Sequence, residues 1–122
     1  MARSALVVDD SVSMRQLVTQ TLRGLGFETH EAADGEAALA KARQVGMVDL
    51  VVTDLNMPVM DGITLVKKLR ALGAFKYTPV LVLTTETRDE FKASAKQAGA
   101  TGWLVKPFDP NQLAAVVRRI LP

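Results

Sequence analysis

Four short runs of consecutive apolar residues stand out along the chain, at 5–8, 50–52, 80–83 and 103–105. Apolar and polar side chains do not alternate within these runs. Each run therefore predicts a strand that is buried on both faces, as strands of parallel sheets are. A fifth, weaker run at 27–32 contains Glu28, His30 and Glu31. Its charged positions predict an edge strand that is partly exposed to water.

Segments with the apolar spacing of helices separate these runs. Between Met14 and Leu25 the apolar residues recur every three or four positions, which predicts one buried helix stripe. Ser13 and Gln16 predict a capping box at the start of this helix, and Gly26 predicts its end. Four further helices are predicted to begin at carboxylates able to cap them, namely Asp34, Asp61, Asp89 and Asp109.

The alternation of strands and helices, repeated five times, predicts one α/β domain over residues 1–122 with a parallel sheet. The absence of cysteine excludes a disulfide framework, a zinc–thiolate site and a cysteine nucleophile. A net charge of +2 is too small to indicate a nucleic-acid surface. No apolar stretch approaches the ~20 residues that a membrane helix needs. We expect a soluble, cytoplasmic protein without nucleic-acid or membrane partners.

Polar side chains that could bind ligands or react lie where the buried strands end. Asp9 and Asp10 follow the first run, Asp54 ends the third strand, Thr84 the fourth and Lys106 the fifth. The carboxyl ends of parallel strands share one edge of the sheet, and ligands bind there. We therefore expect three carboxylates, a hydroxyl and an ammonium to converge on one crevice.

The charges of this group predict a bound cation. Three neighbouring carboxylates repel one another, and Lys106 compensates only one of them. Magnesium fits, because it binds carboxylate oxygens and also accepts phosphate oxygens. The only histidine, His30, lies on the predicted edge strand, which disfavours a transition metal. A carboxylate beside magnesium suggests an aspartyl-phosphate nucleophile, for which Asp54 is the best candidate, with Asp9 and Asp10 as metal-side acids.

These residues, in this order, resemble the receiver domain of bacterial two-component response regulators. The resemblance covers essentially the whole chain and rests on Asp9-Asp10, Asp54 in TDLNMPVMDG, Thr84-Thr85 and Lys106-Pro107-Phe108. It implies a flavodoxin-like, doubly wound (βα)5 fold whose five-stranded parallel sheet has the order 2-1-3-4-5. It also implies a cis peptide bond before Pro107. With Asn56 and Glu86, the chain is similar to the single-domain chemotaxis members of the family.

The resemblance implies a magnesium-dependent reaction in which Asp54 accepts a phosphoryl group from the phosphohistidine of a sensor histidine kinase. The implied magnesium ligands are Asp10, Asp54 and the backbone carbonyl of Asn56, with Asp9 acting mostly through water. By the same resemblance, Thr84 and Lys106 contact the phosphoryl group.

Two further roles follow from the resemblance. Asn56 and Glu86 occupy the two variable positions that tune self-dephosphorylation. Trp103 occupies the switch position, where the family usually carries Tyr or Phe. In the implied switch, Thr84 moves toward the phosphoryl group and the aromatic side chain turns inward.

The function implied is a phosphorylation-activated chemotaxis switch whose phosphorylated form binds a downstream protein such as the flagellar motor switch protein. Its partners would be the kinase, the motor protein and a phosphatase, and the chain would be a monomer. It would promote its own phosphorylation and dephosphorylation rather than act as an enzyme on other substrates. A phosphorelay intermediate or phosphate sink without motor binding is an alternative.

Three more points bear on function. A small magnesium-dependent phosphatase is disfavoured, because Asn56 stands where a second acid would follow Asp54. Arg88, Lys92 and Lys96 recur at four-residue spacing on the predicted fourth helix. They form either a solvated face or an electropositive docking face beside Trp103. No effector domain is encoded within the 122 residues, so we expect no direct regulation of DNA.

Overall fold

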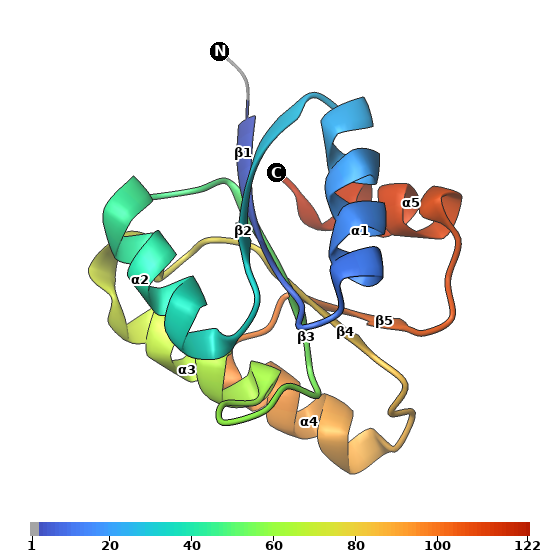
Figure 1. The fold of residues 1–122 in the computed structure, drawn as a ribbon. Helices are drawn as coiled ribbons and strands as arrows, with labels where there is room; N and C mark the ends of the chain where they lie inside the picture. The colour runs from blue at the N-terminus through green and yellow to red at the C-terminus, as the bar shows by residue number, and fades with distance from the viewer. Residues whose placement is uncertain (1–2) are drawn as a thin grey trace.

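The computed structural model describes residues 3–122, which form a central sheet with helices on both faces (Figure 1). The strands are β1 (Arg3–Val8), β2 (Phe27–Ala32), β3 (Leu50–Asp54), β4 (Val80–Thr84) and β5 (Gly102–Val105). The helices are α1 (Val12–Gly24), α2 (Gly35–Val45), α3 (Gly62–Ala71), α4 (Asp89–Ala98) and α5 (Pro110–Ile120), with a 3-10 turn η1 (Gly73–Phe75). All pairings are parallel, in the order β2-β1-β3-β4-β5. The expected fold and strand order are confirmed.

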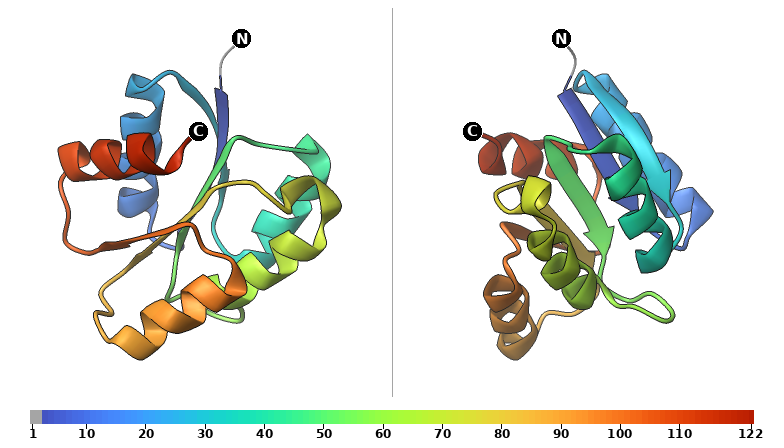
Figure 2. Two further views of the ribbon diagram at one scale, coloured as in Figure 1. Left: turned by 180° about the vertical axis from the view of Figure 1, so that it is seen from behind. Right: turned by 90° about the vertical axis from the view of Figure 1, so that its left-hand side faces the viewer.

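The helices divide between the two faces of the sheet, with α1 and α5 on one side and α2, α3 and α4 on the other (Figures 1 and 2). Strand β1 contributes to both cores. Ala5 and Val7 pack with α1 and α5, whereas Leu6 and Val8 pack with α2 and α3. Burial on both faces explains why the strand sequences are continuously apolar. Within residues 3–122, no helix is long and apolar enough to cross a membrane.

The two edges of the sheet differ from its centre in burial. Strand β2 is an edge strand, as predicted, and His30 on it is half-buried. Strand β5 was predicted to be buried on both faces, and this prediction is wrong. All four of its residues are half-buried, because β5 forms the second edge and has a neighbouring strand on one side only.

Three of the predicted helix caps are confirmed. Asp34, Asp61 and Asp109 each accept a hydrogen bond from the backbone N–H three residues later. At Asp109 the bond is reciprocal, because the Gln112 side chain accepts from the Asp109 N–H at 2.9 Å. Each of these carboxylates therefore satisfies a free N–H donor in the first turn of its helix.

Of the other two predicted helix starts, that of α1 needs correction. Ser11, not Ser13, is the N-cap of α1, and its Oγ accepts from the N–H of Met14 at 3.3 Å. The helix begins early because the Ser11 N–H is bound to the Asp9 carboxylate, so the chain turns directly after the acids. Helix α4 begins at Asp89, as predicted, and its N-cap Arg88 makes no side-chain cap bond.

Gly62 places the start of α3 directly against the end of β3. Its N–H donates to the carbonyl of Leu55 at 2.8 Å. A Cβ at this position would collide with the carbonyl oxygen of Asp54 and lie 3.0 Å from the Cα of Leu55. The strand that carries Asp54 is therefore braced by a backbone contact that only glycine permits.

We expect Gly62→Ala to lower the free energy of unfolding by about 1–3 kcal/mol, because the added methyl group overpacks the backbone of β3. Gly24→Ala is the matched control, since a Cβ at Gly24 meets no heavy atom within 4 Å. It should leave stability unchanged or slightly raised. Urea unfolding of the two variants measures the difference, and equal midpoints would contradict the close-contact argument.

Candidate functional site

Three carboxylates and one ammonium meet at the carboxyl edge of the sheet. One oxygen each from Asp9, Asp10 and Asp54 lies within 4.8 Å of the others. The Nζ of Lys106 is 3.0 Å from Oδ1 of Asp54 and 3.6 Å from Oδ2 of Asp9. Residues 97 positions apart in the sequence thus become neighbours, as the parallel strand order leads one to expect.

Strand alternation explains which side chains face one another. Asp54 lies two residues after Val52, which packs with α1 and α5, so the two share a face of the sheet. Thr84 lies two residues after Val82, which packs on the other face, and Trp103 also packs there. The phosphate-acceptor candidate and the switch candidates therefore belong to opposite faces of the same edge.

Asp9 is buried in an unfavourable setting. Its side chain is deep in the structure, with 1% of the residue exposed, and Oδ1 accepts from the N–H of Ser11 at 2.9 Å. Oδ2 is buried without a hydrogen-bond donor from residues 3–122. Burial raises the pKa of Asp9, and the charges of Asp54 and Asp10 raise it further, against the opposing effects of Ser11 and Lys106.

The donor set at this edge fits magnesium. Three carboxylates against the single Lys106 ammonium leave two negative charges when all are ionised. The donors are oxygens, and one of them, Oδ2 of Asp9, is buried and lacks a hydrogen bond. Asp10 and Asn56 are exposed at the rim, where a cation could keep part of its water. A hard divalent cation with several water ligands suits this arrangement.

Arg15 supports the acidic edge, and the sequence reading did not identify it. One guanidinium nitrogen donates to the backbone carbonyl of Asp9 at 2.7 Å, and Nε is 3.1 Å from a carboxylate oxygen of Glu31. Arg15 thereby ties α1 to β2 across the end of β1. Its position in α1 gave no signal, because an arginine on a helix is usually a solvated residue.

Thr84, Glu86 and Trp103 form a second, hydrogen-bonded group. The Thr84 side chain is fully buried, and its Oγ1 accepts from the Glu86 N–H at 2.9 Å. The Trp103 indole N–H donates to the Glu86 carbonyl at 3.3 Å. The Glu86 backbone, through its N–H and its carbonyl, therefore connects the Thr84 hydroxyl to the Trp103 ring. The Lys106 N–H donates to the Thr84 carbonyl at 2.7 Å, and the Lys106–Pro107 bond is cis, as the resemblance implied.

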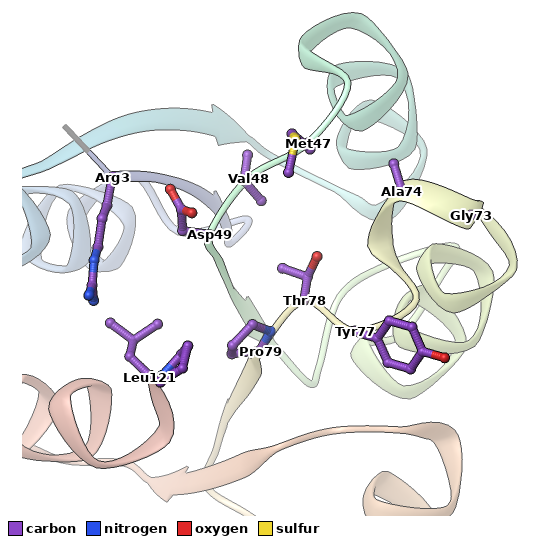
Figure 3. Close-up of a pocket in the computed structure, with 11 residues that line it drawn as sticks. Arg3, Met47, Val48, Asp49, Gly73, Ala74, Tyr77, Thr78, Pro79 and Leu121 are labelled. Carbon is purple, nitrogen blue, oxygen red and sulfur yellow. The ribbon is translucent and has the colours of Figure 1, made fainter. Parts of the chain in front are cut away.

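A cavity lies at the other end of the sheet, where the strands begin (Figure 3). It measures about 340 Å³, and its charged side chains include Arg3 and Asp49. The Asp49 carboxylate is already engaged, because it accepts from the N–H of Ser4 at 2.7 Å. This cavity does not contain the acid cluster, so the candidate site is the carboxyl edge.

Comparison with known proteins identifies the family. The model of the response regulator receiver domain matches residues 5–118. Chemotaxis protein CheY-3 of Vibrio cholerae is 49% identical over 116 residues, which cover 94% of this chain and 88% of the relative. Receiver domains are signalling modules that bind Mg²⁺ at an acidic pocket, and the Asp9, Asp10 and Asp54 cluster forms such a pocket here.

Solved structures agree with this assignment. The chemotaxis response regulator CheY4 of Vibrio cholerae is 50% identical, with a TM-score of 0.93 and coverage of 99% of this chain and 100% of that one. The receiver domain of a sensor histidine kinase from Pseudomonas aeruginosa, 27% identical, has a TM-score of 0.86, with coverage of 98% and 97%. That structure has a magnesium ion coordinated in the active site cleft. The chain therefore belongs to the response regulator receiver domain family, as a CheY-like phosphorylation-activated switch of the chemotaxis type.

Proposed function

We propose that Asp54 accepts a phosphoryl group from a sensor histidine kinase in a magnesium-dependent reaction, with residues 1–122 acting as one receiver domain. The observation that carries the proposal is the setting of the Asp54 carboxylate. It is buried, 3.0 Å from the Lys106 ammonium, and shares a cluster with two further acids. The magnesium held by the related receiver domain supports the same reading.

The chain's own residues account for the transfer. The Asp54 carboxylate, held by Lys106, would attack phosphorus while the bond from phosphorus to the histidine nitrogen breaks, and the kinase histidine leaves with that electron pair. Lys106 balances negative charge on the phosphoryl oxygens. Asp10, Asp54 and the Asn56 carbonyl would hold Mg²⁺, and Asp9 would act through water. Bound Mg²⁺ supplies charge neutralisation at the transferring group.

The switch begins at Thr84. A hydroxyl can donate one hydrogen bond while accepting another, so Thr84 can donate to a phosphoryl oxygen from β4. A displacement of Thr84 would be passed to Trp103 through the Glu86 backbone, which is hydrogen-bonded to both side chains. Moving a two-state equilibrium from 1:99 to 99:1 needs about 5.5 kcal/mol. Charge-assisted bonds to Thr84 and Lys106, at roughly 1.5–3 kcal/mol each, approach that value.

The same site would lose its phosphoryl group through the chain's own chemistry. Asn56 and Glu86 flank it on the loops after β3 and β4, and we assign them to tuning the rate of self-dephosphorylation. A phosphatase would act at this edge as well. We expect the protein to work in the cytoplasm as a monomer.

Phosphorylation of Asp54 can be measured directly. With Mg²⁺ and acetyl phosphate, we expect a mass gain of one phosphoryl group, with acetate as the leaving group. Asp54→Asn should show no gain, because the amide is not a nucleophile of this kind, and chelation of Mg²⁺ should abolish the gain in the unchanged chain. A phosphoryl group that persists in Asp54→Asn would refute the assignment.

The downstream partner is proposed to be the flagellar motor switch protein, bound through α4 and the neighbouring Trp103. Arg88, Lys92 and Lys96 are exposed along α4. A hollow of about 310 Å³ lies between Lys92, Lys96 and Trp103. A basic rim beside an aromatic ring suits an acidic amphipathic segment of a partner.

Charge reversal separates partner binding from phosphorylation. We expect the double variant Lys92→Glu/Lys96→Glu to bind the motor switch protein at least tenfold more weakly. The change in Trp103 fluorescence during titration measures this binding. Phosphorylation of Asp54 should be unchanged, since both lysines are exposed and lie outside the acid cluster. If the phosphorylated, unchanged chain binds no better than the unphosphorylated chain, the phosphate-sink alternative is favoured instead.

Asp9→Asn should stabilise the protein at neutral pH. Because the folded state raises the pKa of Asp9, its ionisation disfavours folding above that pKa, and the penalty disappears as pH falls toward the unfolded value of about 4. We expect a gain on the order of 1 kcal/mol at pH 7 that shrinks in acid. Thermal unfolding between pH 4 and 8 tests this, with Asp49→Asn, outside the cluster, as the control. A gain that grows in acid would contradict the argument.

A further inference from the structure

Arg88 binds the carboxylate of Glu86 through three donors. Its Nε is 2.9 Å from Oε1 and its second terminal nitrogen is 3.1 Å from Oε2, which makes a forked ion pair. Its backbone N–H also donates to Oε1, at 2.9 Å. We propose that Arg88 is a positioning residue for the Glu86 carboxylate. It keeps this carboxylate at the start of α4 and neutralises its charge, which lets anionic phosphodonors reach Asp54. This inference rests on the proposed phosphorylation of Asp54.

Glu86 is placed where a free carboxylate would matter. Its N–H lies 2.9 Å from the buried Oγ1 of Thr84, the hydroxyl assigned to the phosphoryl group. The Glu86 backbone is thus one hydrogen bond from Thr84, in the loop between β4 and α4. The carboxyl edge of the sheet already carries three carboxylates against one ammonium. An unpaired fourth carboxylate beside it would repel a phosphodonor that is itself an anion.

The contacts around Arg88 explain why this exposed pair persists. An isolated ion pair in water is weak, and the Arg88 side chain is 61% exposed. Here, however, the guanidinium lies over the Phe91 ring, 4.5 Å from its centre, and a further nitrogen is 3.3 Å from Oε1 of Glu90. These contacts hold the Arg88 guanidinium together with the fork to Glu86. The Arg88 hydrogen bonds also lower the pKa of Glu86, so its carboxylate is charged at neutral pH.

The test is the second-order rate of Asp54 phosphorylation by acetyl phosphate with saturating Mg²⁺ at low ionic strength. Arg88→Gln is expected to lower this rate about two- to fivefold, the effect of one uncompensated negative charge on the loop after β4, mainly through a higher KM. In a Glu86→Gln background the same substitution should change the rate much less, because Arg88 acts through Glu86. Added salt at 0.5 M should shrink the difference.

Arg88→Lys distinguishes positioning from net charge. Lysine keeps the cation but cannot form the fork, so we expect it to recover no more than half of the lost rate. Full recovery by lysine, or an equal loss with and without Glu86, would overturn the positioning role. No phosphorylation of the unchanged chain would overturn the proposed function and this inference together. Normal phosphorylation with an unchanged rate in Arg88→Gln would overturn this inference alone.

Discussion

Repulsion among three carboxylates at one edge of the sheet is the constraint on which the rest of the structure depends. Asp9, Asp10 and Asp54 are brought within 4.8 Å of one another, and among residues 3–122 only the Lys106 ammonium pairs with them. Burial makes this arrangement costlier, because charge is less stable away from water. The surrounding elements hold it in place: Gly62 braces the strand that carries Asp54, and Arg15 holds the backbone of Asp9.

In the proposed mechanism, the residue that accepts the phosphoryl group and the residues that respond to it lie on different faces of the sheet. Asp54 shares a face with the core under α1 and α5, whereas Thr84 and Trp103 belong to the face covered by α4. Glu86 joins these functions, because its two backbone groups bind Thr84 and Trp103 while its side chain binds Arg88. A change of charge at one face can therefore reach an exposed helix on the other through a few hydrogen bonds.

The parallel fold and the acidic edge were predictable from the sequence, and the reasons are physical. Strands buried on both faces are mostly apolar, so polar residues mark where they end, and the candidate site residues stand at those ends. The burial of β5 was overestimated because an apolar run does not reveal whether the strand has a neighbour on both sides. The ion pair between Arg88 and Glu86 could not be predicted from the sequence either, because a forked contact between residues two positions apart depends on how the chain turns locally.

The start of α1 also could not be predicted from residue type alone. Ser11 and Ser13 are equally good caps by residue type, and the choice fell to Ser11 because Asp9 binds its N–H. The acid that was predicted to serve the metal thus also sets where α1 begins. Local propensity could not decide this, because the deciding hydrogen bond belongs to the site.

Charge counting explains why a cation belongs to the proposed reaction rather than being an accessory to it. The cluster carries two uncompensated negative charges before any phosphoryl group arrives, and phosphorylation of Asp54 adds about one more. Lys106 cannot balance both, so the product would be less favourable than the reactant unless a divalent ion entered with the phosphoryl group. The buried Oδ2 of Asp9, which lacks a hydrogen bond and lies 3.6 Å from Lys106, belongs to the same crowded edge. The stability of the phosphorylated state therefore depends on the cations at this edge as well as on Asp54.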